Sequence, residues 1–150
     1  MLVRSCILLF LSIASTYACD CSDPGVQRKS SSSDLIFRGT ITALRDASKL
    51  AGIKFTKDTG KIVVFRVTRV WKGDVPQTFE MPAVEETSMC IGFWPDFLKV
   101  GADLLVYASR SGGPDYDTSI CGFHMLAKNS KDLRKLGPGE EPKKQIQIPK

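Results

Sequence analysis

The stretch Ala18-Cys19-Asp20-Cys21 organises this chain, because the residues before it have the layout of a removable leader. Residues 1–18 carry one positive charge, a short apolar run and small residues at the exit, a pattern typical of a secretory signal peptide. The apolar run is too short to span a bilayer. We therefore expect secretion and cleavage after Ala18, which makes Cys19 the first residue of the mature protein. A cut after Ala14 is the alternative.

Four cysteines remain after the expected cut, at positions 19, 21, 90 and 121. An even number of cysteines in an oxidising compartment predicts two disulfides. Cys19 and Cys21 are too close to bond easily with each other, so each should reach one of the distant pair, in either combination. A chain that begins with Cys19 also places an α-amine beside a carbonyl group, and these two groups together can chelate a metal ion.

Length and charge predict a single secreted domain. Residues 19–137 are enough for one hydrophobic core, and no second apolar segment is long enough to span a membrane. With 21 Lys and Arg against 16 Asp and Glu, the chain is mildly basic. This balance suits acidic polysaccharide or solubility, and the chain lacks the dense basic runs of a nucleic-acid-binding protein. Residues 138–150 are charged and without periodicity, so we expect a disordered tail.

The pattern of apolar residues predicts an all-β domain. Strands are expected at 35–44, 62–71, 78–84, 104–108 and 118–126, and short helices at 26–33 and 130–136. The apolar alternation of the second strand slips at Val70, which predicts a bulge. Asn129 is expected to cap the second helix and Gly137 to end it. Five strands without alternating helices favour a small closed barrel.

Motifs for catalysis are missing from the sequence. The only histidine, His124, falls in an expected strand, where a structural role is the better interpretation. The spacing of the cysteines fits disulfides better than a zinc site, and there is no H-E-x-x-H motif, phosphate-binding glycine loop or paired-carboxylate signature. We therefore expect a protein that is not an enzyme and has no cofactor of its own.

From Cys19 to Gly137 the chain resembles the amino-terminal, netrin-like domain of the tissue inhibitors of metalloproteinases. The segments that carry this resemblance are Cys19-Asp20-Cys21, Ser33-Asp34-Leu35-Ile36-Phe37-Arg38, Phe65-Arg66-Val67-Thr68-Arg69-Val70-Trp71-Lys72-Gly73, Pro82-Ala83, Thr87-Ser88-Met89-Cys90 and Thr118-Ser119-Ile120-Cys121. The resemblance implies a closed five-stranded, OB-like Greek-key barrel in a monomeric protein. It also implies two disulfides, Cys19 with Cys90 and Cys21 with Cys121.

By the same resemblance, the partner is a matrix metalloproteinase-like zinc endopeptidase. The α-amine and carbonyl oxygen of Cys19 would bind the zinc ion of that peptidase and replace its catalytic water. The resemblance places eight residues against the peptidase: Cys19, Asp20, Cys21, Ser22, Thr87, Ser88, Met89 and Cys90. Asp20 would enter the S1′ pocket.

The chain departs from the family at several points. The family's third disulfide in this domain and its six-cysteine carboxy-terminal domain have no counterpart. Asp20 stands where the family places a small neutral residue, and an unpaired carboxylate is costly to bury in an apolar S1′ pocket. A second hypothesis is therefore a netrin-like binding module without inhibitory activity, which would bind extracellular polysaccharide or a protein ligand through its basic surface.

Overall fold

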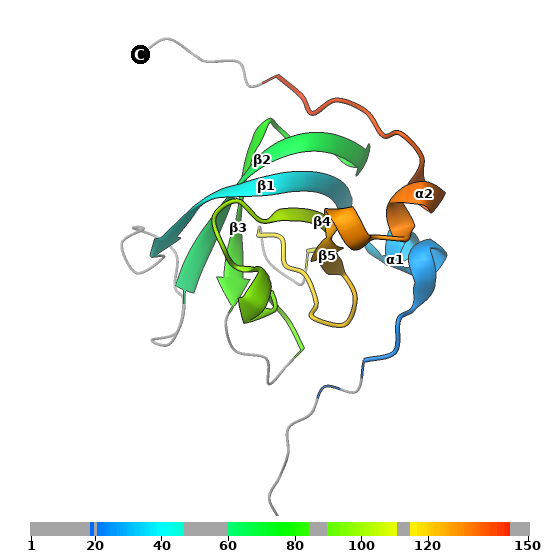
Figure 1. Ribbon diagram of the computed structural model, residues 1–150, viewed down its shortest axis with the longest axis horizontal. Helices are drawn as coiled ribbons and strands as arrows, with labels where there is room; N and C mark the ends of the chain where they lie inside the picture. The colour runs from blue at the N-terminus through cyan, green and yellow to red at the C-terminus, as the bar shows by residue number, and fades with distance from the viewer. Residues whose placement is uncertain (1–18, 20, 47–59, 85–89, 111–114, 145–150) are drawn as a thin grey trace, which may run out of the picture.

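The computed structural model describes residues 19, 21–46, 60–84, 90–110 and 115–144, and they build one antiparallel sheet with two short helices (Figure 1). The strands are β1 (Leu35–Asp46), β2 (Gly60–Lys72), β3 (Thr78–Val84), β4 (Asp103–Ala108) and β5 (His124–Leu126). The helices are α1 (Gly25–Ser32) and α2 (Asp132–Leu136), with 3-10 turns η2 (Pro95–Phe97) and η3 (Ala127–Asn129). Residues 47–59, between β1 and β2, lie outside the described part of the chain.

The strand order β3-β2-β1-β4-β5 places the longest strands at the centre of the sheet. All four pairings are antiparallel. In the part of the chain that the structure describes, β3 and β5 are edges and do not pair with each other. The predicted five-stranded, mostly β fold is therefore confirmed, whereas closure of the sheet into a barrel stays a prediction.

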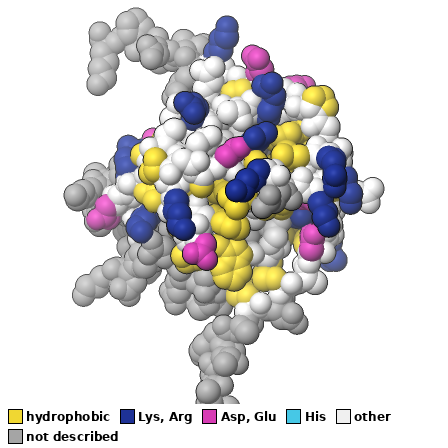
Figure 2. Space-filling view, viewed as in Figure 1, with side chains coloured by type: hydrophobic (Ala, Val, Ile, Leu, Met, Phe, Trp, Pro, Cys, Tyr) yellow, Lys and Arg dark blue, Asp and Glu magenta, His cyan; other side chains and the backbone are white. Residues whose placement is uncertain are grey.

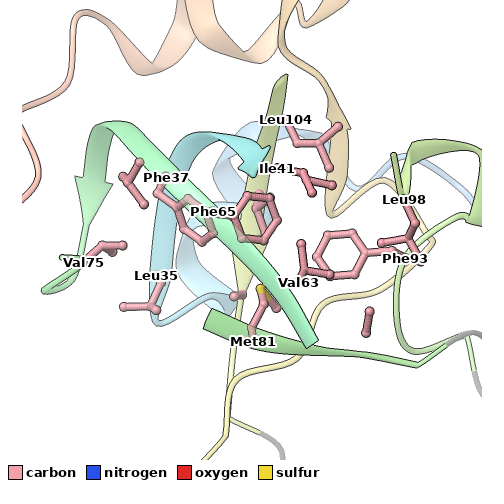
Figure 3. Packing of buried hydrophobic residues seen from close by; sticks show 14 of the residues in the cluster. Leu35, Phe37, Ile41, Val63, Phe65, Val75, Met81, Phe93, Leu98 and Leu104 are labelled. Carbon is pink, nitrogen blue, oxygen red and sulfur yellow. The ribbon is translucent and has the colours of Figure 1, made fainter. Parts of the chain in front are cut away.

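The main hydrophobic core lies on one face of the sheet, as alternation along the strands requires. Phe37 and Phe65 are fully buried at its centre, with ring centroids 5.3 Å apart in an edge-to-face arrangement (Figure 3). Phe93 and Leu98, from the segment before β4, close one end of this core (Figure 3). The loop that follows Cys90 is therefore anchored by its own apolar side chains.

The predicted bulge in β2 is confirmed. Pairing with β1 passes over one residue of β2 between Val67 and Arg69, and over another between Val70 and Lys72. Each extra residue bends and twists the strand locally. The slip in apolar alternation at Val70 therefore marks the place where β2 curls around the core.

A smaller cluster packs on the opposite face of the sheet. Ile36 of β1 and Leu105 and Tyr107 of β4 point away from the main core and pack against Leu133 and Leu136 of α2. Helices α1 and α2, far apart in sequence, lie side by side at this end of the molecule (Figure 1). The two helices thereby join the amino-terminal segment to the end of the domain.

Two predicted elements are shorter than expected. The last strand was predicted over 118–126, but β5 begins only at His124. Residues 118–120 instead bond to the segment after Cys90: the Gly92 N–H donates to the Thr118 carbonyl at 2.7 Å. Likewise α2 begins at Asp132, whose N–H donates to the Ser130 hydroxyl, so Asn129 is not its cap.

The end of α2 was predicted correctly, but the structure of the tail that follows it was not. Gly137 ends the helix as expected, with a φ of 79° that favours glycine. The tail was predicted to be disordered from residue 138, and this is wrong for residues 138–144. Glu140 exchanges backbone hydrogen bonds of 2.7 and 2.9 Å with Val70, and the tail runs beside the end of β2 (Figure 1). Strand β3 begins only opposite Arg66, so the tail covers an edge that β3 leaves unpaired.

Among the described residues, no helix has the length and apolar character needed to cross a membrane.

Candidate functional site

Two disulfides fix the amino-terminal segment to two separate loops. Cys19 is bonded to Cys90 and Cys21 to Cys121, with Cα atoms 5.9 and 4.8 Å apart. This is the pairing that the family resemblance implied. The bonds span 71 and 100 residues of sequence, so each constrains the unfolded chain strongly. We call these four residues the disulfide cluster.

The structure places half of the predicted peptidase-binding residues. Cys19 and Cys90 are partly buried and bonded to each other, whereas Cys21 and Ser22 are exposed. Asp20, Thr87, Ser88 and Met89 lie outside the described residues. Every cysteine of the disulfide cluster is bonded to another cysteine, so Cys19 can meet a metal ion only through its backbone groups. In the described ranges, no three His, Cys, Asp or Glu side chains gather as a possible metal site.

The hydroxyl of Ser119 joins the two loops of the disulfide cluster. It donates a hydrogen bond to the Cys90 carbonyl at 2.8 Å and accepts one from the Cys121 N–H at 3.2 Å. The Ile120 N–H also donates to the Cys90 carbonyl, at 3.1 Å. Cys90 has a φ of 57°, a left-handed conformation that costs energy for a residue with a side chain. The two donors to its carbonyl offset that cost.

His124 also contacts the two loops that carry Cys90 and Cys121. Its ring is 2 % exposed and packs on Phe93, with centroids 4.8 Å apart. The Trp94 N–H donates to Nε2 at 3.0 Å, so the proton of the neutral ring is on Nδ1, which donates to the Ser119 carbonyl at 3.1 Å. Burial lowers the pKa of His124 to about 4. These contacts support the structural role predicted for His124.

The pKa of His124 makes the free energy of unfolding depend on pH. The unfolded chain binds a proton at its histidine near pH 6.5, whereas the native ring does so only near pH 4. The native state should therefore lose about 3 kcal/mol of stability as pH falls through this interval. Urea unfolding between pH 7 and 4 measures this loss. A His124→Gln variant should be less stable at pH 7 and show a shallower pH dependence; a slope equal to that of the wild type would contradict the assignment.

A buried charge network anchors α1, which follows Cys21 closely. The ammonium group of Lys29 is 1 % exposed and lies 2.6 Å from Oδ2 of Asp132 and 3.1 Å from Oδ1 of Asp23. The Tyr107 hydroxyl donates to the same Oδ2 of Asp132 at 3.0 Å. Burial, together with the Asp132 charge, raises the pKa of Tyr107. The network connects α1, α2 and β4 and so fixes the direction in which the chain leaves Cys21.

Sequence reasoning missed Lys29 and Ser119 as supports of the site. Lys29 lies in a polar stretch that gave no sign of burial, and a lysine is rarely buried unless it is paired. Ser119 stood within the segment Thr118-Ser119-Ile120-Cys121, but a hydroxyl that bridges two loops cannot be recognised before the disulfides bring the loops together.

Neither a scan against protein-family models nor a search of curated proteins found a match for this chain. The geometry defines a five-stranded antiparallel β domain. Two disulfides attach its amino-terminal segment to the rest of the domain, and buried polar contacts support it.

Proposed function

We propose that the mature protein is a secreted inhibitor of zinc endopeptidases and begins at Cys19. The observation that supports this proposal is the pair of disulfides that holds Cys19 beside Cys90 and Cys21 beside Cys121. Two disulfides are compatible with an extracellular location, in the extracellular space or matrix. The proposal gives the protein no enzymatic activity and no metal of its own.

The chemistry depends on the first residue. After cleavage, Cys19 carries an α-amine; α-amines ordinarily have a pKa of about 8, low enough for a zinc ion to displace the proton readily. The amine nitrogen and the carbonyl oxygen of one residue close a five-membered ring around a metal ion. They would take the position of the catalytic water of the peptidase, which removes the nucleophile of the reaction.

Rigidity of the segment would make binding strong. The disulfides hold the chain on both sides of Asp20, and the buried Lys29 network holds α1 directly after it. Little conformational entropy is then lost when the segment enters the cleft of a peptidase. We further propose that the curled sheet closes into an OB-like barrel between its β3 and β5 edges, which would stiffen the support for the segment.

Inhibition by the secreted protein tests this proposal. We expect the mass of the secreted protein to equal that of a chain that begins at Cys19. We also expect stoichiometric, reversible inhibition of a matrix metalloproteinase catalytic domain. Binding to heparin without inhibition would favour the alternative of a polysaccharide-binding module. On the face in Figure 2, Lys and Arg are spread out with Asp and Glu between them. The described residues of this face therefore form no concentrated basic patch that would favour a polysaccharide-binding module.

Asp20 is expected to set selectivity. If its carboxylate meets an apolar S1′ pocket, Asp20→Thr should strengthen inhibition of a typical matrix metalloproteinase by about 2 to 3 kcal/mol. Inhibition constants of the two proteins measure this effect, and their melting temperatures should be nearly equal because every described core residue is unchanged. An unchanged inhibition constant would show that residue 20 does not enter the pocket.

A further inference from the structure

Trp94 is unusual among the large apolar side chains that the structure describes. Only Trp94, 42 % exposed, and Val100 are exposed residues of this kind in the described ranges. The neighbours Pro95 and Asp96 are exposed as well. Trp94 therefore directly precedes η2, in a segment where a tryptophan, a proline and an aspartate are exposed in succession.

Three hydrogen bonds hold Trp94 although it is exposed. Its backbone N–H donates to Nε2 of His124 at 3.0 Å, and its carbonyl accepts from the Phe97 N–H at 2.9 Å. Its indole N–H donates to the Ile120 carbonyl at 2.9 Å. The ring is thus fixed in direction by side-chain and backbone bonds. An exposed but immobile indole loses little entropy on binding, which is why tryptophan often dominates the affinity of protein interfaces.

Ile120 joins Trp94 to the disulfide cluster. The carbonyl of Ile120 holds the indole of Trp94, and its N–H holds the Cys90 carbonyl at 3.1 Å. Cys90 is in turn bonded to Cys19. One residue therefore fixes both the indole and the half-cystine that carries the amino terminus, so the two features keep a constant relative position.

We propose that Trp94 is a second contact for the same zinc endopeptidase, on the surface beside its active-site cleft. This inference rests on the proposed function, because it assigns a further part of that interface. When Cys19 is on the zinc ion, Trp94 packs on the flank of the cleft that faces Cys90. The matching surface is an apolar patch with a basic side chain at its edge, which pairs with Asp96.

The chain provides its own control for this proposal. Its other tryptophan, Trp71 in β2, donates its indole N–H to the Gly137 carbonyl at 3.0 Å and packs against Gly139 of the tail. A side chain at Gly139 would lie 2.8 Å from the Trp71 ring, so the tail covers that indole closely. Two tryptophans in different surroundings can be distinguished in one labelled sample.

The experiment is fluorine NMR of the intact mature protein labelled with 5-fluorotryptophan. Trp94→Phe and Trp71→Phe variants assign the two resonances, and the catalytic domain of a matrix metalloproteinase is then added. The resonance of Trp94 should shift or broaden, and that of Trp71 should stay in place. In parallel, Trp94→Ala should weaken inhibition by about 10- to 100-fold, mainly through faster dissociation, whereas Trp71→Phe should leave it unchanged.

The possible results distinguish the proposed contact at Trp94 from the proposed inhibition of the peptidase. Strong inhibition with an unmoved Trp94 resonance would overturn the second contact and leave the inhibitor proposal standing. A shifted Trp94 resonance without inhibition would support the Trp94 surface and contradict chelation by Cys19. If neither inhibition nor a shift occurs, both proposals are wrong. The labelled protein carries no substitution, so the resonance of Trp94 can be measured whether or not Trp94→Ala folds.

Discussion

One alanine added ahead of Cys19 in the mature protein is expected to reduce inhibition by about 1,000-fold or more, equivalent to about 4 kcal/mol. The addition converts the α-amine of Cys19 into an amide, whose nitrogen does not donate a lone pair to zinc at neutral pH. The added residue also occupies the space that the metal needs. The inhibition constants of the two mature proteins against one peptidase measure the loss.

The fold should not respond to the added alanine. Cys19 is partly buried through its disulfide, but the addition lies at the chain end and leaves both disulfides and the core intact. Circular dichroism and melting temperature should therefore match those of the unextended protein. Undiminished inhibition by the extended protein, with its amino-terminal sequence verified, would show that the amine is not the zinc ligand.

Lys29→Met is expected to destabilise the domain by about 3 to 5 kcal/mol. The substitution removes the cation from a buried network and leaves the Asp132 carboxylate, which is 7 % exposed, without its charge partner. The methionine fills similar space, so the loss comes from the unpaired charge rather than from a cavity. Chemical denaturation at pH 7 measures the free energy of unfolding.

Lys72→Met is the matched control, because Lys72 also bonds to α1. Its ammonium group donates to the Ser30 carbonyl at 2.8 Å but is exposed, so its removal should cost less than about 1 kcal/mol. Adding Asp132→Asn to Lys29→Met should recover part of the stability, since the amide still accepts from the Tyr107 hydroxyl without a buried charge. Equal losses for the two lysine variants would contradict the importance of the buried network.

The sheet could be predicted because its strands follow from local patterns of apolar residues. Apolar residues that alternate along parts of β1 and β2 enter the core, the continuous apolar run of β4 is buried on both faces, and the slip at Val70 marked a real bulge. The end of the chain was not predictable in the same way. Residues 118–120 have strand-like composition but bond to the loop after Cys90, and the polar tail is held by backbone bonds to Val70. Both depend on contacts between distant segments, which periodicity does not report.

The site was predictable to the extent that cysteine chemistry determines it. Two disulfides followed from the cysteine count, and the family resemblance implied their pairing. A structural role was predicted for His124, but its partners and the roles of Ser119 and Trp94 were not, because these residues act through hydrogen bonds that exist only after folding. The burial of Lys29 likewise depends on Asp132, about a hundred residues away in the chain.

The distance between the α-nitrogen of Cys19 and the catalytic zinc ion tests the account most directly. A crystal structure of the mature protein bound to a matrix metalloproteinase catalytic domain provides it. Chelation predicts that the nitrogen and the carbonyl oxygen of Cys19 both lie about 2.0 to 2.2 Å from zinc, with the catalytic water gone. A complex in which water remains on the zinc ion and the Cys19 nitrogen lies beyond bonding distance would contradict the proposed mechanism.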